Sequence, residues 1–346
     1  MTLLSVLGGL TVAATVAATA RGIAARRRAL APVAPRLRHP LLYLPLSVTN
    51  TTALAIARRR NLPGGTLRPG VRCDTHTVPV PASGAPVTVL SYQTPDRSTP
   101  SAALLWIHGG GTIIGAADMA HGWCSRVAAE LGILVISVDY RLAPENPYPA
   151  GLDDCYHALR WLHDHAEDLG VHPDRIAVGG ESAGGGLAAT LAQRATDTGV
   201  PVAFQALVYP MLDDRTVLRP TPSIPFLPPW TYKSNRFGWT CYLGRPPAYA
   251  DDRPYIAAAR RSNLTGLPAA WIGVGDLDLF HTEDIDYAHR LNQAGVACEL
   301  VEVPGMYHSA DLLRGNAASM IGFRASLINA LKTALVQPHR GDLPVN

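Results

Sequence analysis

Short apolar runs alternate with amphipathic stretches along most of the chain. The runs have the length of buried strands and most are bounded by turn residues, at 103–107, 134–138, 176–179, 204–209, 270–274 and 298–303. The stretches between them repeat apolar residues at helical spacing, at 124–131, 152–166, 184–196, 283–294 and 317–335. Strands that alternate with helices predict an α/β fold with a mostly parallel central sheet flanked by helices on both faces.

Two regions interrupt this rhythm. Short alternating runs at 78–80 and 87–90, separated by a proline-containing turn, predict an opening hairpin. The segment 213–247 shows no strand pattern, and prolines at 220, 222, 225, 228 and 229 exclude a long first helix there. An insertion at this point would lie beside the carboxyl edge of the sheet, where ligands bind in open α/β folds. We interpret 213–247 as a cap or lid, and 71–212 with 248–340 as the core.

The N-terminal segment, 1–70, leaves three interpretations open. Residues 2–20 carry no charge, and Arg21 and Arg26–Arg28 follow them. That length could just span a bilayer, so a membrane anchor or membrane-lying helix, a cleaved signal and a helix packed on the protein all remain possible. A second element, 41–60, ends in three arginines that fit either attraction to an acidic lipid surface or a solvated helix end. Because the basic cluster follows the apolar segment, a cytoplasmic or membrane-associated location is expected rather than a secreted one.

Composition narrows the class of protein. The chain has 346 residues, of which 47% are hydrophobic and 16% charged, the balance of a globular enzyme. Its formal net charge is only +3, and most of its basic residues are scattered apart from the N-terminal clusters, so no nucleic-acid partner is expected. Five widely spaced cysteines without a C-x-x-C pair disfavour a zinc site and a disulfide framework.

One five-residue stretch has the context of a reactive serine. Gly180, Glu181, Ser182, Ala183 and Gly184 stand between a predicted strand and a predicted helix. A serine on a sharp strand-to-helix turn exposes its oxygen to a base and to a substrate, and glycines permit that turn. The alternative is a glycine-rich turn that contains a serine by chance.

A second glycine-rich stretch, His108, Gly109, Gly110 and Gly111, directly follows the strand that ends at Ile107. Successive glycines leave backbone N–H groups free to point at one place, as stabilisation of an oxyanion requires. Alone, these glycines also fit a flexible turn. The two motifs together, about seventy residues apart, resemble the hormone-sensitive-lipase-like family of α/β-hydrolase esterases.

The resemblance covers about residues 71–335 and includes Tyr140–Glu145 and Tyr148–Ala150. It implies an α/β-hydrolase fold with a helical cap. It also implies the catalytic and supporting residues, which are Ser182 as nucleophile, His308 as base, Asp278 as orienting acid, Gly109, Gly110, Gly111 and Ala183 in the oxyanion hole, and His108 and Glu181 as motif support. Asp276 is the other candidate for the acid, and counting back from the Tyr287–Ala288 pair favours Asp278. Glu181 departs from the family's commoner aspartate.

The expected function is hydrolysis of short- to medium-chain carboxylic esters, from a small molecule or a lipid, through a serine-linked acyl-enzyme. This chemistry needs no metal or organic cofactor. Deacylation of amides by the same residues is one alternative. A ligand-binding protein on the same fold is a second, although the chain retains His308, which such receptors of this family lose.

Overall fold

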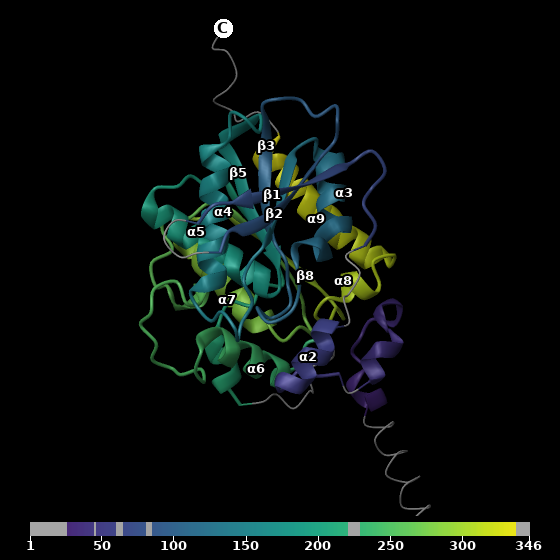
Figure 1. The fold of residues 1–346 in the computed structure, drawn as a ribbon. Helices are drawn as coiled ribbons and strands as arrows, with labels where there is room; N and C mark the ends of the chain where they lie inside the picture. Colours follow the sequence, from purple (N-terminus) through teal and green to yellow (C-terminus); the bar gives the residue numbers. More distant parts are fainter. Residues whose placement is uncertain (1–25, 45, 60–64, 81–84, 221–228, 337–346) are drawn as a thin grey trace, which may run out of the picture.

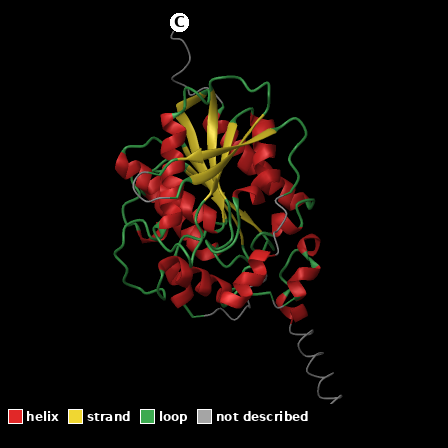
Figure 2. Cartoon of the chain, in the orientation of Figure 1, coloured by secondary structure: helices red, strands yellow, loops and turns green. Residues whose placement is uncertain are grey.

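A single eight-stranded sheet forms the centre of the molecule in this computed structural model, which describes residues 26–44, 46–59, 65–80, 85–220 and 229–336 (Figures 1 and 2). The spatial order is β1-β2-β4-β3-β5-β6-β7-β8. Strand β2 pairs antiparallel with β1 and with β4, whereas β3 to β8 run parallel to one another. The strands span Arg72–Val78, Val87–Gln93, Ser101–Ile107, Leu134–Asp139, Val171–Glu181, Phe204–Val208, Ala270–Gly275 and Cys298–Val303. The predicted strands and the mostly parallel sheet are confirmed. The predicted hairpin is present, but its first strand spans Arg72–Val78 rather than 78–80, because Pro79 has no N–H to continue the ladder.

Helices cover both faces of the sheet (Figure 2). Along β3, Leu105 and Ile107 enter one buried apolar cluster and Leu104 and Trp106 enter the other, because successive side chains of a strand point to opposite faces. The first cluster includes α4, α5 and α7, and the second includes α3 and α9. These helices span His121–Leu131 (α3), Ala150–Asp164 (α4), Ala183–Thr198 (α5), His281–Gln293 (α7) and Ala318–Leu335 (α9). All five predicted helices are confirmed.

The parallel strands end at one edge of the sheet. The loops that follow β3, β5, β7 and β8 therefore meet at that edge, which in Figure 1 faces downward. These loops hold the glycine stretch, Ser182, Asp278 and His308. The short helix α8 (Ala310–Leu313) comes directly after His308.

The N-terminal helix α2 (Thr51–Arg59) and the helix α6 (Tyr232–Leu243) of the predicted cap lie at the same end of the molecule (Figure 1). The short helix η4 (Asp214–Leu218) also belongs to the predicted cap, and its Val217 carbonyl oxygen accepts a hydrogen bond from the Tyr232 hydroxyl of α6. Ser47 Oγ lies 2.9 Å from Thr231 Oγ1, and the Val48 N–H donates to Ser234 Oγ at 3.0 Å, so the N-terminal region contacts the start of α6. The division into cap and core stays a prediction.

Residues 2–20, on which the three N-terminal interpretations depend, lie outside the described residues. Within the part that is described, no helix is both long enough and apolar enough to cross a membrane.

Candidate active site

Ser182 occupies a sharp turn between β5 and α5. Its φ of 55° and ψ of −122° are unusual for a residue with a side chain, and such conformations concentrate at functional sites. The residues that flank this turn must be glycines because there is no room for a Cβ atom. A Cβ on Gly184 would lie 2.1 Å from the carbonyl oxygen of Ile107, and one on Gly180 would lie 2.5 Å from the same oxygen. The predicted strand–turn–helix context of Ser182 is therefore present.

Hydrogen bonds connect Ser182 to His308 and His308 to Asp278. His308 Nε2 lies 2.9 Å from Ser182 Oγ, and Nδ1 lies 2.8 Å from Asp278 Oδ2. With a neutral imidazole, Nδ1–H donates to the carboxylate and Nε2 accepts the serine proton. All three residues are buried, so little water screens the interaction. This arrangement can withdraw a proton from the serine hydroxyl and stabilise the resulting imidazolium.

Neighbouring groups fix the ring and the carboxylate. The ring of Tyr209 packs edge-on against His308 at 4.7 Å between centroids, and Phe280 packs similarly at 5.1 Å. The Phe280 N–H donates to Asp278 Oδ1 at 2.9 Å. Asp276, the other candidate acid, accepts the Gly305 N–H at 2.7 Å instead. Of the two aspartates after β7, only Asp278 contacts His308.

The glycine stretch after β3 lies against the serine turn. A Cβ on Gly109 would come within 3.4 Å of the Ser182 Cβ. Gly110 and Gly111 have φ values of 114° and 62°, which glycine adopts at little cost. Among the described residues, the N–H groups of Gly110, Gly111 and Ala183 have no hydrogen-bond acceptor. They belong to three of the four residues that the family resemblance implies for the oxyanion hole.

His108 holds the glycine stretch in place from its buried side. It is fully buried and stacks on Tyr140, with 4.3 Å between ring centroids. Its Nδ1 donates to the Gly109 carbonyl oxygen at 2.7 Å. Burial lowers the pKa of His108. A neutral His108 therefore fixes the loop without placing a charge beside the serine.

A narrow cavity of about 10 Å³ lies beside the serine turn, with room for about one water molecule. It is lined by groups from the glycine loop, from α5 and from the cap, namely Thr112, Ala183, Leu187, Trp239, Tyr242 and Ile256 among others. A larger, open groove is lined by Thr99, His163 and His172, near the starts of β3 and β5 and away from Ser182. In the described ranges, no three His, Cys, Asp or Glu residues gather in a way that could hold a metal ion.

Sequence reasoning missed a buried ionic cluster behind His308. The Tyr209 hydroxyl donates to Asp311 Oδ1 at 3.0 Å, and Arg324 forms ion pairs with Asp311 and with Glu181, the latter at 3.3 Å. Burial raises the pKa of Glu181, an effect that Arg324 opposes. One signal was available, because Arg324 is the single charged residue among the first fourteen residues of α9, which is a mostly apolar helix. Its partners come from distant parts of the chain and could not be read from the pattern.

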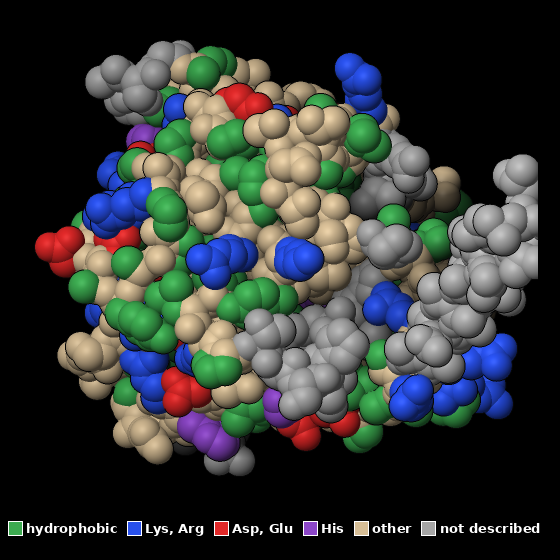
Figure 3. Space-filling model, turned by 90° about the horizontal axis from the view of Figure 1, so that it is seen from below, with side chains coloured by type: hydrophobic (Ala, Val, Ile, Leu, Met, Phe, Trp, Pro, Cys, Tyr) green, Lys and Arg blue, Asp and Glu red, His purple; other side chains and the backbone are tan. Residues whose placement is uncertain are grey.

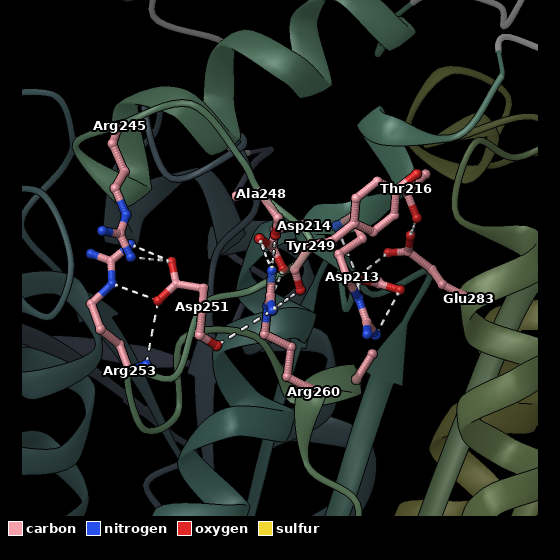
Figure 4. Close-up of polar contacts among 12 residues, drawn as sticks. Asp213, Asp214, Thr216, Arg245, Ala248, Tyr249, Asp251, Arg253, Arg260 and Glu283 are labelled. Carbon is pink, nitrogen blue, oxygen red and sulfur yellow. Dashed lines mark hydrogen bonds and ion pairs between the residues drawn. The ribbon is translucent and has the colours of Figure 1, made fainter.

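Ion pairs also fasten the predicted cap to the core (Figure 4). Arg260 Nε and Nη2 donate to the two oxygens of the Asp214 carboxylate, at 2.7 and 2.8 Å, and Arg260 also donates to the carbonyl oxygens of Ala248 and Tyr249. From α7, Glu283 accepts the backbone N–H groups of Leu212 and Asp213. The chain is thus held on both sides of α6.

The fold and this constellation define a class of protein, and comparison with known proteins identifies the same class. Residues 104–312 match the family model described as alpha/beta hydrolase fold. The chain belongs to this family, in agreement with its resemblance to the hormone-sensitive-lipase-like esterases. It is a hydrolase that acts on ester bonds.

Particular relatives support the assignment. Esterase LipI of Mycobacterium tuberculosis is 34% identical over 267 residues, which cover 76% of this chain and 82% of LipI. The solved structure of a bacterial heroin esterase is 37% identical with a TM-score of 0.78, covering 88% of this chain and 99% of that one. Esterase LipW of Mycobacterium marinum is 34% identical with a TM-score of 0.79, over 88% and 96% of the two chains.

Proposed function

We propose that this esterase works through Ser182, His308 and Asp278 and a covalent acyl-enzyme. The observation that carries the proposal is the hydrogen-bonded chain from Ser182 Oγ through His308 to Asp278, with distances of 2.9 and 2.8 Å. Ser182 Oγ attacks the ester carbonyl carbon while His308 Nε2 takes its proton. As the carbon–oxygen bond to the alcohol breaks, His308 returns that proton to the leaving oxygen. Water activated by His308 then hydrolyses the acyl-enzyme.

The oxyanion would form where the glycine stretch meets α5. The N–H groups of Gly110, Gly111 and Ala183 are the donors, and Gly109 allows the loop to approach Ser182. Loss of one such donor costs on the order of 100- to 1000-fold in rate in enzymes of this type. These donors act in a buried site, where hydrogen bonds to a charge are stronger than in water.

The narrow cavity beside Ala183 is the acyl side of the site. A leaving alcohol must lie next to His308 Nε2 to receive its proton, and His308 is absent from the lining of this cavity, whereas the oxyanion donor Ala183 is part of it. The acyl chain therefore points between α5 and the cap, where Trp239 and Tyr242 limit its length. This favours short acyl groups over long ones.

The predicted lid would act through Trp230. The position of a Cβ on Gly111 falls 2.1 Å from the Trp230 ring, so the indole covers the glycine loop directly. Displacement of this segment would open the site. Contact of the N-terminus with a membrane surface, and amide hydrolysis by the same residues, stay predictions.

A series of p-nitrophenyl esters from acetate to palmitate tests the proposal. Ser182→Ala should remove nearly all activity, and Asp278→Asn should lower kcat on the order of 10⁴-fold, because the neutral amide no longer selects the reactive tautomer. Asp276→Asn is the matched control and should keep activity within a few-fold. Equal losses in the two aspartate variants would contradict the assignment of the acid. A rate maximum at palmitate would contradict the short acyl site, and anilide substrates measured in parallel distinguish amide from ester preference.

A further inference from the structure

The charges of this chain are divided unequally along the sequence. The first 73 residues contain 11 arginines and no aspartate or glutamate, and the remaining 273 contain 19 basic and 27 acidic residues. The N-terminal part thus carries a charge of +11 and the rest −8, which the modest net charge of +3 conceals. Such an asymmetry indicates an interaction with an anionic partner.

Most arginines of the described N-terminal region point outward. Arg27, Arg28, Arg36 and Arg59 are exposed, and within the described residues none of them has an acidic partner. Arg58 behaves differently, because it forms an ion pair with Glu145 and donates to the carbonyl oxygens of Ile113 and Ala143, each at 2.8 Å. Helix α2 therefore contacts the core through Arg58, whereas the exposed Arg59 has no acidic partner among the described residues.

Large apolar side chains are also exposed in the same two segments, 26–44 and 46–59. Leu41, Tyr43 and Leu44 are 37%, 47% and 46% exposed, and Ile56 on α2 is 50% exposed. They are four of the eight large exposed apolar residues in the described part of the chain, although this region is a small share of it. An outward face that combines basic and apolar side chains is typical of segments that lie at a membrane interface. Nucleic acid would need the charge but not the apolar groups.

This surface lies at the end of the molecule that holds Ser182 (Figure 1), and the view of that end shows Lys and Arg side chains scattered among apolar ones (Figure 3). It also contacts the loops of the site. Arg58 binds Ile113 just after the glycine stretch, the Ala34 N–H donates to the Gly305 carbonyl at 3.1 Å, and the Tyr307 hydroxyl donates to the Leu37 carbonyl at 3.0 Å.

We propose that residues 26–44 and 46–59 form a binding surface for anionic lipid bilayers, here called the basic N-terminal surface. The arginines attract the anionic headgroups, and the exposed apolar side chains enter the boundary of the acyl region. Bound in this way, the protein holds the Ser182 end of its sheet next to the bilayer. Its substrates would then include esters dissolved in the membrane, a step that rests on the proposed function, whereas the binding itself does not.

Co-sedimentation of the full chain with vesicles tests the binding without any measurement of activity. Vesicles of phosphatidylcholine alone are compared with vesicles that contain phosphatidylglycerol at the same total lipid concentration. We expect clear preference for the anionic vesicles, reduced by salt. Arg27→Gln/Arg28→Gln should lower the partition coefficient about fivefold for each arginine removed. Tyr43→Ser/Leu44→Ser should lower it at constant charge.

Two further measurements make the result decisive. Arg160→Gln/Lys332→Gln removes two exposed positive charges from α4 and α9, outside this surface, and should leave vesicle binding almost unchanged. Duplex DNA supplies an anionic partner without an apolar phase. No preference for anionic vesicles, equal losses in the two charge variants, or binding to DNA as tight as to vesicles and insensitive to Tyr43→Ser/Leu44→Ser would each overturn the proposal.

Discussion

Two groups of buried acidic residues lie near His308 and its partner Asp278, and the fold treats them in opposite ways. Glu181 and Asp311 share a buried guanidinium, that of Arg324. Glu283 and Asp284 are equally buried on α7, yet among the described residues neither forms an ion pair with a base. The first group is paired with a base, whereas in the second group burial favours the protonated, uncharged form.

The two groups of acids differ because their neighbours differ in charge. Burial alone lowers the pKa of Arg324, but Asp311, Tyr209 and Glu181 outweigh it, so the pKa is raised and the guanidinium stays charged. On α7, burial raises the pKa of Glu283 and of Asp284 well above their ordinary values, with neighbouring acids adding to the effect. Neutral donors satisfy Glu283, which accepts two backbone N–H groups and the Thr216 hydroxyl.

Removal of Arg324 should cause the largest effect. Arg324→Met leaves two carboxylates buried without a cation, and breaking a buried ion pair in this way typically costs about 3–5 kcal/mol of unfolding free energy. Urea unfolding at neutral pH measures it. The triple variant Arg324→Met/Glu181→Gln/Asp311→Asn removes every charge and should recover most of the loss. If Arg324→Met alone costs less than about 1 kcal/mol, the acids are not held as charged groups.

Truncation of Glu283 should have the second largest effect. Glu283→Ala removes the acceptor of the Leu212 and Asp213 N–H groups, at 2.7 and 3.1 Å, and the partner of Thr216. At about 1 kcal/mol for each hydrogen bond, the loss of unfolding free energy is about 3 kcal/mol. Glu283→Gln keeps an amide oxygen at the same place and should cost much less. A similar loss in both variants would show that Glu283 is needed as a carboxylate, against the comparison with Arg324.

The sequence predicted those parts of the molecule that short segments determine. Apolar runs gave the strands, and the glycines around Ser182 predicted its turn because their spacing is local. Asp276 and Asp278 show where prediction from the residues alone reaches its limit. Both follow the same strand, and only their three-dimensional surroundings distinguish the acid that contacts His308 from the one that does not. The position of His308 in the loop after the last strand could also be predicted from the sequence.

The ionic cluster could not be predicted in the same way. Glu181 and Arg324 are 143 positions apart, and Tyr209 and Asp311 are 102 apart, so only the closed sheet brings them together. A charged residue in an apolar helix predicts a buried partner without naming it. Likewise, Asp284 follows Glu283 on a polar helix, where nothing local distinguishes a buried acid from an exposed one.

Removal of the Tyr209 hydroxyl tests the charge of Asp311 and should cause a smaller loss of unfolding free energy than the two variants above. Tyr209→Phe removes its hydrogen bond to Asp311, and bonds to charged groups contribute about 1.5–3 kcal/mol to the unfolding free energy. Tyr307→Phe is the matched control, because its buried hydroxyl donates at the same 3.0 Å to the neutral Leu37 carbonyl and should cost only about 1 kcal/mol. Thermal unfolding compares the two. Equal costs would indicate that Asp311 carries no more charge than a carbonyl group.

Asp284 should give the smallest effect and one with a characteristic pH dependence. In the unfolded chain its pKa is about 3.9, and in the fold burial raises that pKa. Below about pH 4 both states hold the proton. As the pH rises above 4, the unfolded chain releases it and the folded chain does not, so the unfolding free energy falls by at most about 1.4 kcal/mol per pH unit for this group. Asp284→Asn cannot titrate. It should nearly equal the parent protein at pH 4 and exceed its stability by about 1 kcal/mol at pH 5. Asp286→Asn, exposed on the same helix, is the control for the loss of a carboxylate from α7. Parallel profiles for the parent protein and Asp284→Asn would mean that Asp284 is ionised in the fold, and the contrast between the paired and the protonated acids would fail.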